Sequence, residues 1–137
     1  MPLPWKPGPD RGTGDAHVLA SSLRMSNARG MLGFVRAASR VRQQLRDADG
    51  LVGYSLIGQP HRKTFWTLSA WRDQAALDAF VQAQPHHGIV DQYRPTVTAR
   101  FASWTMQRAE LPSARSQARS LWAEGKARLA TADSTGA

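Results

Sequence analysis

The order of elements along the chain predicts one α+β domain, in which strands and helices alternate as β-α-β-β-α-β. Three observations lead to this fold class. The length of 137 residues is typical of a single domain. Some stretches alternate apolar and polar residues, as half-buried strands do, whereas others repeat apolar residues every three or four positions, as amphipathic helices do. Gly and Pro separate these stretches.

The first half of the pattern is a strand followed by a helix. His17–Leu23 has the composition and flanking residues of a short strand. A helix of about residues 30–47 follows, because its apolar residues share one helical face. These residues are Met31, Phe34, Val35, Ala38, Val41 and Leu45. Gly50 then suits the left-handed conformation that ends many helices.

The second half is a hairpin, a helical region and a final strand. Leu51–Ile57 and Lys63–Trp71 are close enough to pair across a turn. Asp73 is a suitable N-cap for the second helix, and a short helix over residues 86–93 follows. Thr96–Met106 is the last predicted strand. This order is the ferredoxin-like arrangement, a four-stranded antiparallel sheet with both helices on one face.

Three regions differ in composition. Residues 1–16 contain four Pro and three Gly and are predicted to form a flexible N-terminal arm. Residues 17–107 form the ferredoxin-like domain, and residues 108–137 hold an added helix over Pro112–Ala130 and a frayed tail. Two helices cover only one face of the sheet, so the second, apolar face needs a cover. Either a second copy of the chain or the C-terminal helix would provide it.

Composition argues against several classes of protein. Without cysteine the chain has no disulfide or thiolate chemistry, which fits a reducing cytoplasm. No apolar run approaches the roughly 20 residues of a membrane helix, so no membrane partner is expected. The net charge of +8 lies mostly in residues 17–107, where eleven Arg and Lys face five Asp. A solvated basic face is the plainest interpretation, because nucleic-acid binding usually brings runs of Arg and Lys that are absent here.

One segment is similar to a known family. It reads Thr64-Phe-Trp-Thr-Leu-Ser-Ala-Trp-Arg-Asp-Gln-Ala-Ala-Leu-Asp-Ala-Phe-Val and is followed by Pro85-His-His. It resembles the antibiotic-biosynthesis monooxygenase superfamily, most of all its uncharacterised actinobacterial members. The positions that match the family layout are Trp71, Asp73, Ala76 and Leu77. The resemblance covers about residues 17–107 and implies a dimeric α/β barrel of two ferredoxin-like chains, and hence a homodimer.

The resembled family includes cofactor-independent oxygenases of polyketide-like phenols, haem-degrading enzymes and proteins with no known reaction. Its haem-degrading members pair an early-strand Asn with a helix Trp and a His ten residues later. Here the first strand has Ser21 and Ser22, and Phe80 and Val90 occupy the corresponding helix positions. The resemblance therefore implies that no cofactor is used, with haem as the less favoured alternative.

Six residues are candidates for a site. His86 and His87 are possible bases, because a neutral imidazole accepts a phenol proton near pH 7. Adjacent residues point to different sides of a helix, so only one would face a ligand, and His87 is favoured. Arg100 would stabilise an anion. The aromatic residues that would line a cavity are Trp66, Trp104 and Tyr54. The structural alternatives are a polar loop for the two histidines, an exposed strand position for Arg100 and ordinary packing for the three aromatic residues.

These features together predict a small cofactor-independent monooxygenase-like enzyme acting on an aromatic or phenolic molecule, without a metal site. The first alternative is a non-catalytic, dimeric ligand-binding or stress-related module, and the second is a haem-binding or haem-degrading protein. No nucleophile elbow or phosphate-binding loop is present in the sequence. The expected partners are a second copy of the chain and a small aromatic ligand.

Overall fold

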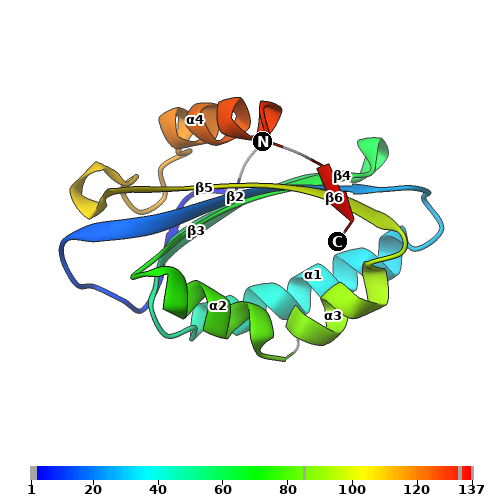
Figure 1. Ribbon diagram of the computed structural model, residues 1–137, viewed down its shortest axis with the longest axis horizontal. Helices are drawn as coiled ribbons and strands as arrows, with labels where there is room; N and C mark the ends of the chain where they lie inside the picture. Colours follow the sequence, from blue (N-terminus) through cyan, green and yellow to red (C-terminus); the bar gives the residue numbers. More distant parts are fainter. Residues whose placement is uncertain (1–2, 85, 133, 137) are drawn as a thin grey trace.

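The computed structural model of the protein describes residues 3–84, 86–132 and 134–136. It has three layers, with helix α4 on one side of a curved sheet and helices α1, α2 and α3 on the other (Figure 1). The strands are β1 (Lys6–Pro7), β2 (Asp15–Met25), β3 (Leu51–Gln59), β4 (Thr64–Trp71), β5 (Val97–Gln107) and β6 (Ser134–Gly136). The helices are α1 (Met31–Arg46), α2 (Gln74–Gln82), α3 (His86–Tyr93) and α4 (Arg119–Ala130).

The four long strands confirm the predicted ferredoxin-like fold. They lie in the order β3-β4-β2-β5, all antiparallel, and the short strands β1 and β6 extend the sheet at its two edges. The local signals are also present as predicted. The Asp73 carboxylate accepts a hydrogen bond from the Ala76 N–H at 2.8 Å and so caps α2. Gly50, after α1, has the left-handed backbone with φ +83°.

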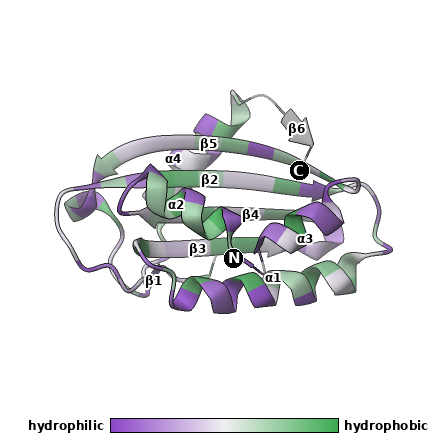
Figure 2. Cartoon of the chain, turned by 60° about the horizontal axis from the view of Figure 1, so that its bottom comes forward, coloured by the Kyte–Doolittle hydropathy of each residue, from purple (hydrophilic) through white to green (hydrophobic). Residues whose placement is uncertain are grey.

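On the α1–α3 side the core consists of two separate clusters. One surrounds Trp71 and joins α1, α2 and β3, and the other joins Phe34 of α1 to Met25 and Val97. Trp71, which ends β4 shortly before α2 begins, is almost completely buried. Figure 2 brings this side forward and shows α1 along β3, with α2 and α3 in front of the central strands and β5 at the margin.

On the α4 side one continuous cluster joins the sheet, α4 and the N-terminal arm. The prediction of a flexible arm is wrong at its centre, because Trp5 is only 3% exposed and β1 pairs with β3. The Trp5 indole covers Gly53, where an added Cβ would lie 2.5 Å from the ring. Proline and glycine exclude this segment from an inner strand but not from a two-residue edge strand. The single chain thus covers this face with its own α4, which was one of the two predicted alternatives.

Polar contacts fasten the arm and α4 to the sheet. The Trp122 indole N–H donates to Ser55 Oγ at 3.0 Å, and that hydroxyl donates to the Leu3 carbonyl at 2.7 Å. Further along the arm, the Asp10 carboxylate accepts a hydrogen bond from Arg108 at 2.6 Å. This hydrogen bond holds the pKa of Asp10 below its ordinary value. Through its hydrogen bonds with Trp122 and Leu3, the buried hydroxyl of Ser55 is satisfied, as a buried polar group must be.

The C-terminal region differs from its prediction at both ends. Helix α4 begins at Arg119 instead of Pro112, because Arg115 and Ala118 have positive φ values of 67° and 54° that interrupt a helix. Ser134–Gly136, predicted to be frayed, forms β6 beside β5. Residues 133 and 137 of the predicted tail, and Pro85 before α3, lie outside the described residues.

Candidate functional site

A row of hydroxyl groups lies between the two clusters on the α1–α3 side of the sheet. We call it the hydroxyl strip, and it consists of Ser21, Thr67, Ser69 and Ser103. Ser21 and Thr67 are opposite one another and share a hydrogen bond, and Leu19 stands between the two remaining serines on neighbouring strands. Polar groups in the middle of a sheet face interrupt the apolar core and bring hydrogen-bonding groups to this side of the sheet.

Aromatic side chains stand at both ends of the hydroxyl strip. At one end Phe34 packs against Phe65 and Tyr93, with ring centroids 4.9 and 5.2 Å apart. At the other end the Trp71 N–H donates to Ser69 Oγ at 2.8 Å, and the indole packs against Phe80 at 5.1 Å. Flat apolar walls beside a few hydroxyl groups are the usual environment of an aromatic ligand that carries polar substituents.

His86 continues the second aromatic group, with its ring 5.3 Å from that of Phe80. Its backbone N–H donates to Gln44 Oε1 at 3.1 Å, and its ring Nδ1 lies 3.2 Å from the Val81 carbonyl. Burial lowers the pKa of His86 below its ordinary value of 6.5. The hydrogen bond with the Val81 carbonyl acts in the opposite direction and raises the pKa, whereas the nearby His87 lowers it further. His86 is therefore neutral at pH 7.

The hydrogen bond at Nδ1 also fixes where the proton of neutral His86 lies. A carbonyl only accepts, so we assign the proton to Nδ1, which donates to Val81. Nε2 is then the basic nitrogen, and it has no hydrogen-bond partner in the described part of the chain. A half-buried imidazole with one nitrogen anchored and the other unprotonated has the form of a general base.

His87, the favoured base in the sequence analysis, lies in a different environment. Its side chain is 47% exposed, and Nε2 lies 3.6 Å from the Asp91 carboxylate on the next turn of α3. The two histidines do point to different surroundings, as adjacent helical residues should. The geometry favours His86 because this ring is the one that packs among aromatic residues.

His17 is a residue that the sequence analysis assigned no role. It lies on β2 in the same alternating row as Leu19 and Ser21, opposite Trp71 on β4 and Thr105 on β5. Its Nε2 is buried and has no hydrogen-bond partner among the described residues. A buried unpaired nitrogen is costly in the free protein and is available to a ligand. The alternation that puts His17 on the same face as Ser21 was visible in the sequence. The sequence did not show which side of the sheet the helices cover.

The structure does not bring the six predicted site residues together. Tyr54 lies on the α1–α3 side with the histidines, but it is 5% exposed and packs in the cluster around Trp71. Trp66, Trp104 and Arg100 lie in the alternating rows that face α4. Two of the three predicted wall residues, Trp66 and Trp104, are thus on the opposite side of the sheet from the predicted bases within one chain.

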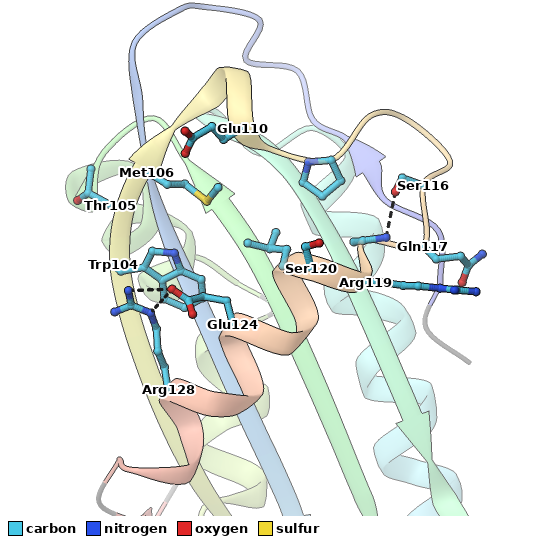
Figure 3. Close-up of a pocket in the computed structure, with 13 residues that line it drawn as sticks. Trp104, Thr105, Met106, Glu110, Ser116, Gln117, Arg119, Ser120, Glu124 and Arg128 are labelled. Carbon is cyan, nitrogen blue, oxygen red and sulfur yellow. Dashed lines mark hydrogen bonds and ion pairs between the residues drawn. The ribbon is translucent and has the colours of Figure 1, made fainter.

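On the α4 side, Trp104 lines an open groove of about 820 Å³ between β5 and α4 (Figure 3). The Arg128 guanidinium lies 4.7 Å from the Trp104 ring centre and is held there by two hydrogen bonds to Glu124. Trp66 is covered in the same way by the Lys126 ammonium at 5.2 Å. Both tryptophan rings therefore already have cation–π partners from α4, which favours a packing role.

Two classes of site lack support in the described residues. No three His, Asp or Glu side chains there gather closely enough to hold a metal ion. No helix in the same part of the chain is long and apolar enough to cross a membrane.

Comparisons with known proteins agree with the fold. The family model for antibiotic biosynthesis monooxygenases matches residues 31–92, which include α1, α2, β3, β4 and most of α3. No curated protein matches the chain at a significant level. The likeness to solved structures is at low sequence identity and shows a shared fold.

Three solved structures illustrate this fold. A variant of SnoaB, a cofactor-independent oxygenase from Streptomyces nogalater, superposes with a TM-score of 0.55 at 13% identity over 66% of this chain and 92% of its own. A putative antibiotic biosynthesis monooxygenase from Deinococcus radiodurans gives 0.54 at 14% identity, over 64% and 89%. A conserved protein from Methanosarcina mazei gives 0.56 at 10% identity, over 65% and 91%. About a third of this chain thus has no counterpart in these structures.

Proposed function

We propose that the protein is a small oxygenase that acts without a cofactor on a flat phenolic molecule bound along the hydroxyl strip. The observation that carries the proposal is His86, whose neutral ring has Nδ1 anchored on Val81 and Nε2 unpartnered within the described residues. The family-model match over residues 31–92 supports it, because this segment contains His86 and its contacts Gln44, Phe80 and Val81. The description of SnoaB as a cofactor-independent oxygenase supports the same reaction class.

The chemistry starts with removal of one proton. His86 Nε2 accepts it from a polycyclic phenol whose ring system includes an activated CH₂ group, and the substrate becomes a delocalised anion. The anion transfers one electron to O₂, and the two radicals combine to form a carbon–oxygen bond. The peroxide takes back the proton from His86. Cleavage of its O–O bond, with loss of the remaining C–H proton, gives a ketone and one water. Both oxygen atoms and all electrons are then accounted for by substrate and O₂.

The other groups of the site position the ligand. The hydroxyl strip donates hydrogen bonds to phenol and carbonyl oxygens, and Trp71 and Phe80 provide flat apolar contact beside His86. The buried Nε2 of His17 gains a hydrogen bond when a ligand hydroxyl reaches it, which would offset the cost of leaving it unpaired. Arg100 lies on the opposite side of the sheet, so anion stabilisation falls to the hydroxyl groups.

Oxygen uptake with a panel of polycyclic phenols and quinols tests the proposal. We expect one substrate class to consume O₂ and, with ¹⁸O₂, to carry one labelled oxygen in the product. His86→Gln should lower kcat roughly 10²–10⁴-fold, the usual contribution of a general base. His87→Gln is the matched control and should retain activity within about threefold.

Two outcomes distinguish the alternatives. Saturable binding of a phenol without oxygen uptake would support a non-catalytic ligand-binding module. A Soret band on addition of haemin that disappears in His86→Gln would support haem binding. Equal activity of the His86 and His87 variants would contradict the role given to His86.

The homodimer remains a proposal and needs a surface other than the part of the sheet face that α4 covers. Trp122, Leu121 and Leu129 of α4 already bury that face within one chain. Light scattering of the intact protein gives the oligomeric state directly, and a monomer at micromolar concentration would contradict a stable dimer.

A further inference from the structure

The outer face of α1 carries an unusual concentration of positive charge. The helix contains four arginines, at positions 36, 40, 42 and 46, and no Asp or Glu. Arg29 stands just before it. Arg36 and Arg40 are both exposed and lie one helical turn apart. Arg42 and Arg46 have the same spacing, and of these Arg46 is exposed and Arg42 is partly buried. Like charges at this spacing repel and weaken a helix by about 0.2–0.5 kcal/mol per pair.

No carboxylate compensates these charges. Among the described residues the ion pairs within 4.0 Å lie elsewhere, and none involves Arg29 or the α1 arginines. Asp47, at the C-cap, directly follows the helix, so the uncompensated charge is greatest over the N-terminal half. An anionic partner would relieve the repulsion among these arginines.

The same face exposes two large apolar side chains. Leu32 is 65% exposed and Val35 38%, and Phe101 is the one other exposed large hydrophobic residue in the described ranges. At about 100° per residue, Leu32 lies roughly opposite the buried Phe34 and between Val35 and Arg36, so Val35 borders the outward face that Leu32 shares with Arg36 and Arg40. In Figure 2, α1 lies along β3 at the border of the helix layer. We call the set of Arg29, Leu32, Val35, Arg36 and Arg40 the α1 patch.

We propose that the α1 patch docks the protein on an anionic lipid surface. Arginines would contact lipid phosphates, and Leu32 and Val35 would enter the boundary between headgroups and acyl chains. A nucleic-acid backbone would use the arginines but leave the two apolar side chains in water, and α1 offers no exposed aromatic residue for base stacking. The convex outer face of one helix also fits a flat surface. This inference does not depend on the proposed reaction.

Sedimentation with lipid vesicles tests the docking. The probes are vesicles of phosphatidylcholine alone and vesicles with about 30% phosphatidylglycerol. We expect binding to the second kind only, weakened by 0.5 M salt because surface charges are screened. Arg36→Gln with Arg40→Gln should weaken binding roughly 30-fold, from the usual contribution of two basic residues at an anionic surface. Leu32→Ser with Val35→Ser should weaken it roughly tenfold.

The matched control removes the same charge elsewhere. Arg62→Gln with Arg115→Gln leaves the same net charge, and both residues are exposed and lie outside α1. This control should keep binding within about twofold, and circular dichroism should show all variants folded. An equal loss in the control would overturn the proposal in favour of general charge attraction. Tighter binding to a 20-base-pair DNA that needs the arginines but tolerates Leu32→Ser with Val35→Ser would overturn it in favour of nucleic acid.

Discussion

The two sides of the sheet are built in different ways. On the α4 side, Trp5, Trp122 and the sheet form one continuous apolar cluster, and its buried hydroxyl Ser55 is fully hydrogen-bonded. On the α1–α3 side the core is split into two clusters, and the hydroxyl strip, His17 and His86 lie between or beside them. The α4 side is one continuous cluster with an open groove beside it, whereas the other side combines two apolar clusters with a row of hydroxyl groups and two imidazoles.

This difference separates stability from chemistry. A continuous core gives the most free energy per buried residue, whereas a row of hydroxyl groups adds little to folding and much to ligand recognition. The added segments, the arm and α4, strengthen the first side and leave the second to α1, α2 and α3. Substitutions on the α4 side should therefore change unfolding, and substitutions on the other side should change function.

The largest effect is expected at Trp122. Trp122→Ala removes a buried indole and leaves Ser55 without its donor, which should lower the free energy of unfolding by about 4 kcal/mol. Trp122→Phe keeps most of the apolar contact and should lose only about 1–2 kcal/mol. Urea unfolding followed by circular dichroism measures both. Equal losses in the two variants would show that the hydrogen bond, not the packing, dominates this contact.

Two glycines of β3 test how the arm is attached. A Cβ at Gly53 would stand 2.5 Å from the Trp5 ring, so Gly53→Ala should displace the arm and lower the free energy of unfolding by about 2 kcal/mol. A Cβ at Gly58 would meet only Phe65, at 3.4 Å, so Gly58→Ala is the control and should change stability by about 0.5 kcal/mol or less. Limited proteolysis should cut the arm in the first variant only. An intact arm in Gly53→Ala would contradict the packing described.

Most of the fold could be predicted from the sequence, because local signals decide it. Periodicity predicted α1, Asp73 was recognised as the N-cap of α2, and the strand that ends at Trp71 was predicted as β4. Tertiary contacts decided what was missed. Proline-rich composition indicates flexibility, but it does not show that Trp5 finds a glycine to pack on.

The candidate site was predictable only in its residue types. Alternation separates Trp66 from Thr67 on β4 but does not say which of them faces the helices. That choice depends on α4, which covers the Trp66 side. Once the facing is known, Trp66 and Trp104 are placed on the α4 side, and the hydroxyl groups lie on the same side of the sheet as His86.

The hydroxyl strip should tolerate loss of its polarity without unfolding. Ser21→Ala with Thr67→Val removes both partners of one hydrogen bond and joins the two apolar clusters, so the free energy of unfolding should stay within about 1 kcal/mol or rise. Turnover or ligand affinity should fall at least about tenfold, because the ligand loses its donors. Ser39→Ala, on the exposed face of α1, is the control and should change neither quantity. A large loss of stability in the double variant would show that the strip supports the fold instead.

The smallest expected effect is the pH dependence of stability due to His86. Its pKa in the folded protein lies below the ordinary 6.5 because burial disfavours the charged ring. The unfolded chain therefore binds a proton at a higher pH than the folded chain does. This contribution to stability is fully present above about pH 6.5 and is lost as the pH falls from there towards the lowered pKa. Urea unfolding between pH 8 and pH 5 should show a smaller decline in His86→Gln than in the unmodified protein. If His86→Gln declines as steeply as the unmodified protein, the ring of His86 is not protected from protonation, and its role as a neutral base loses its structural basis.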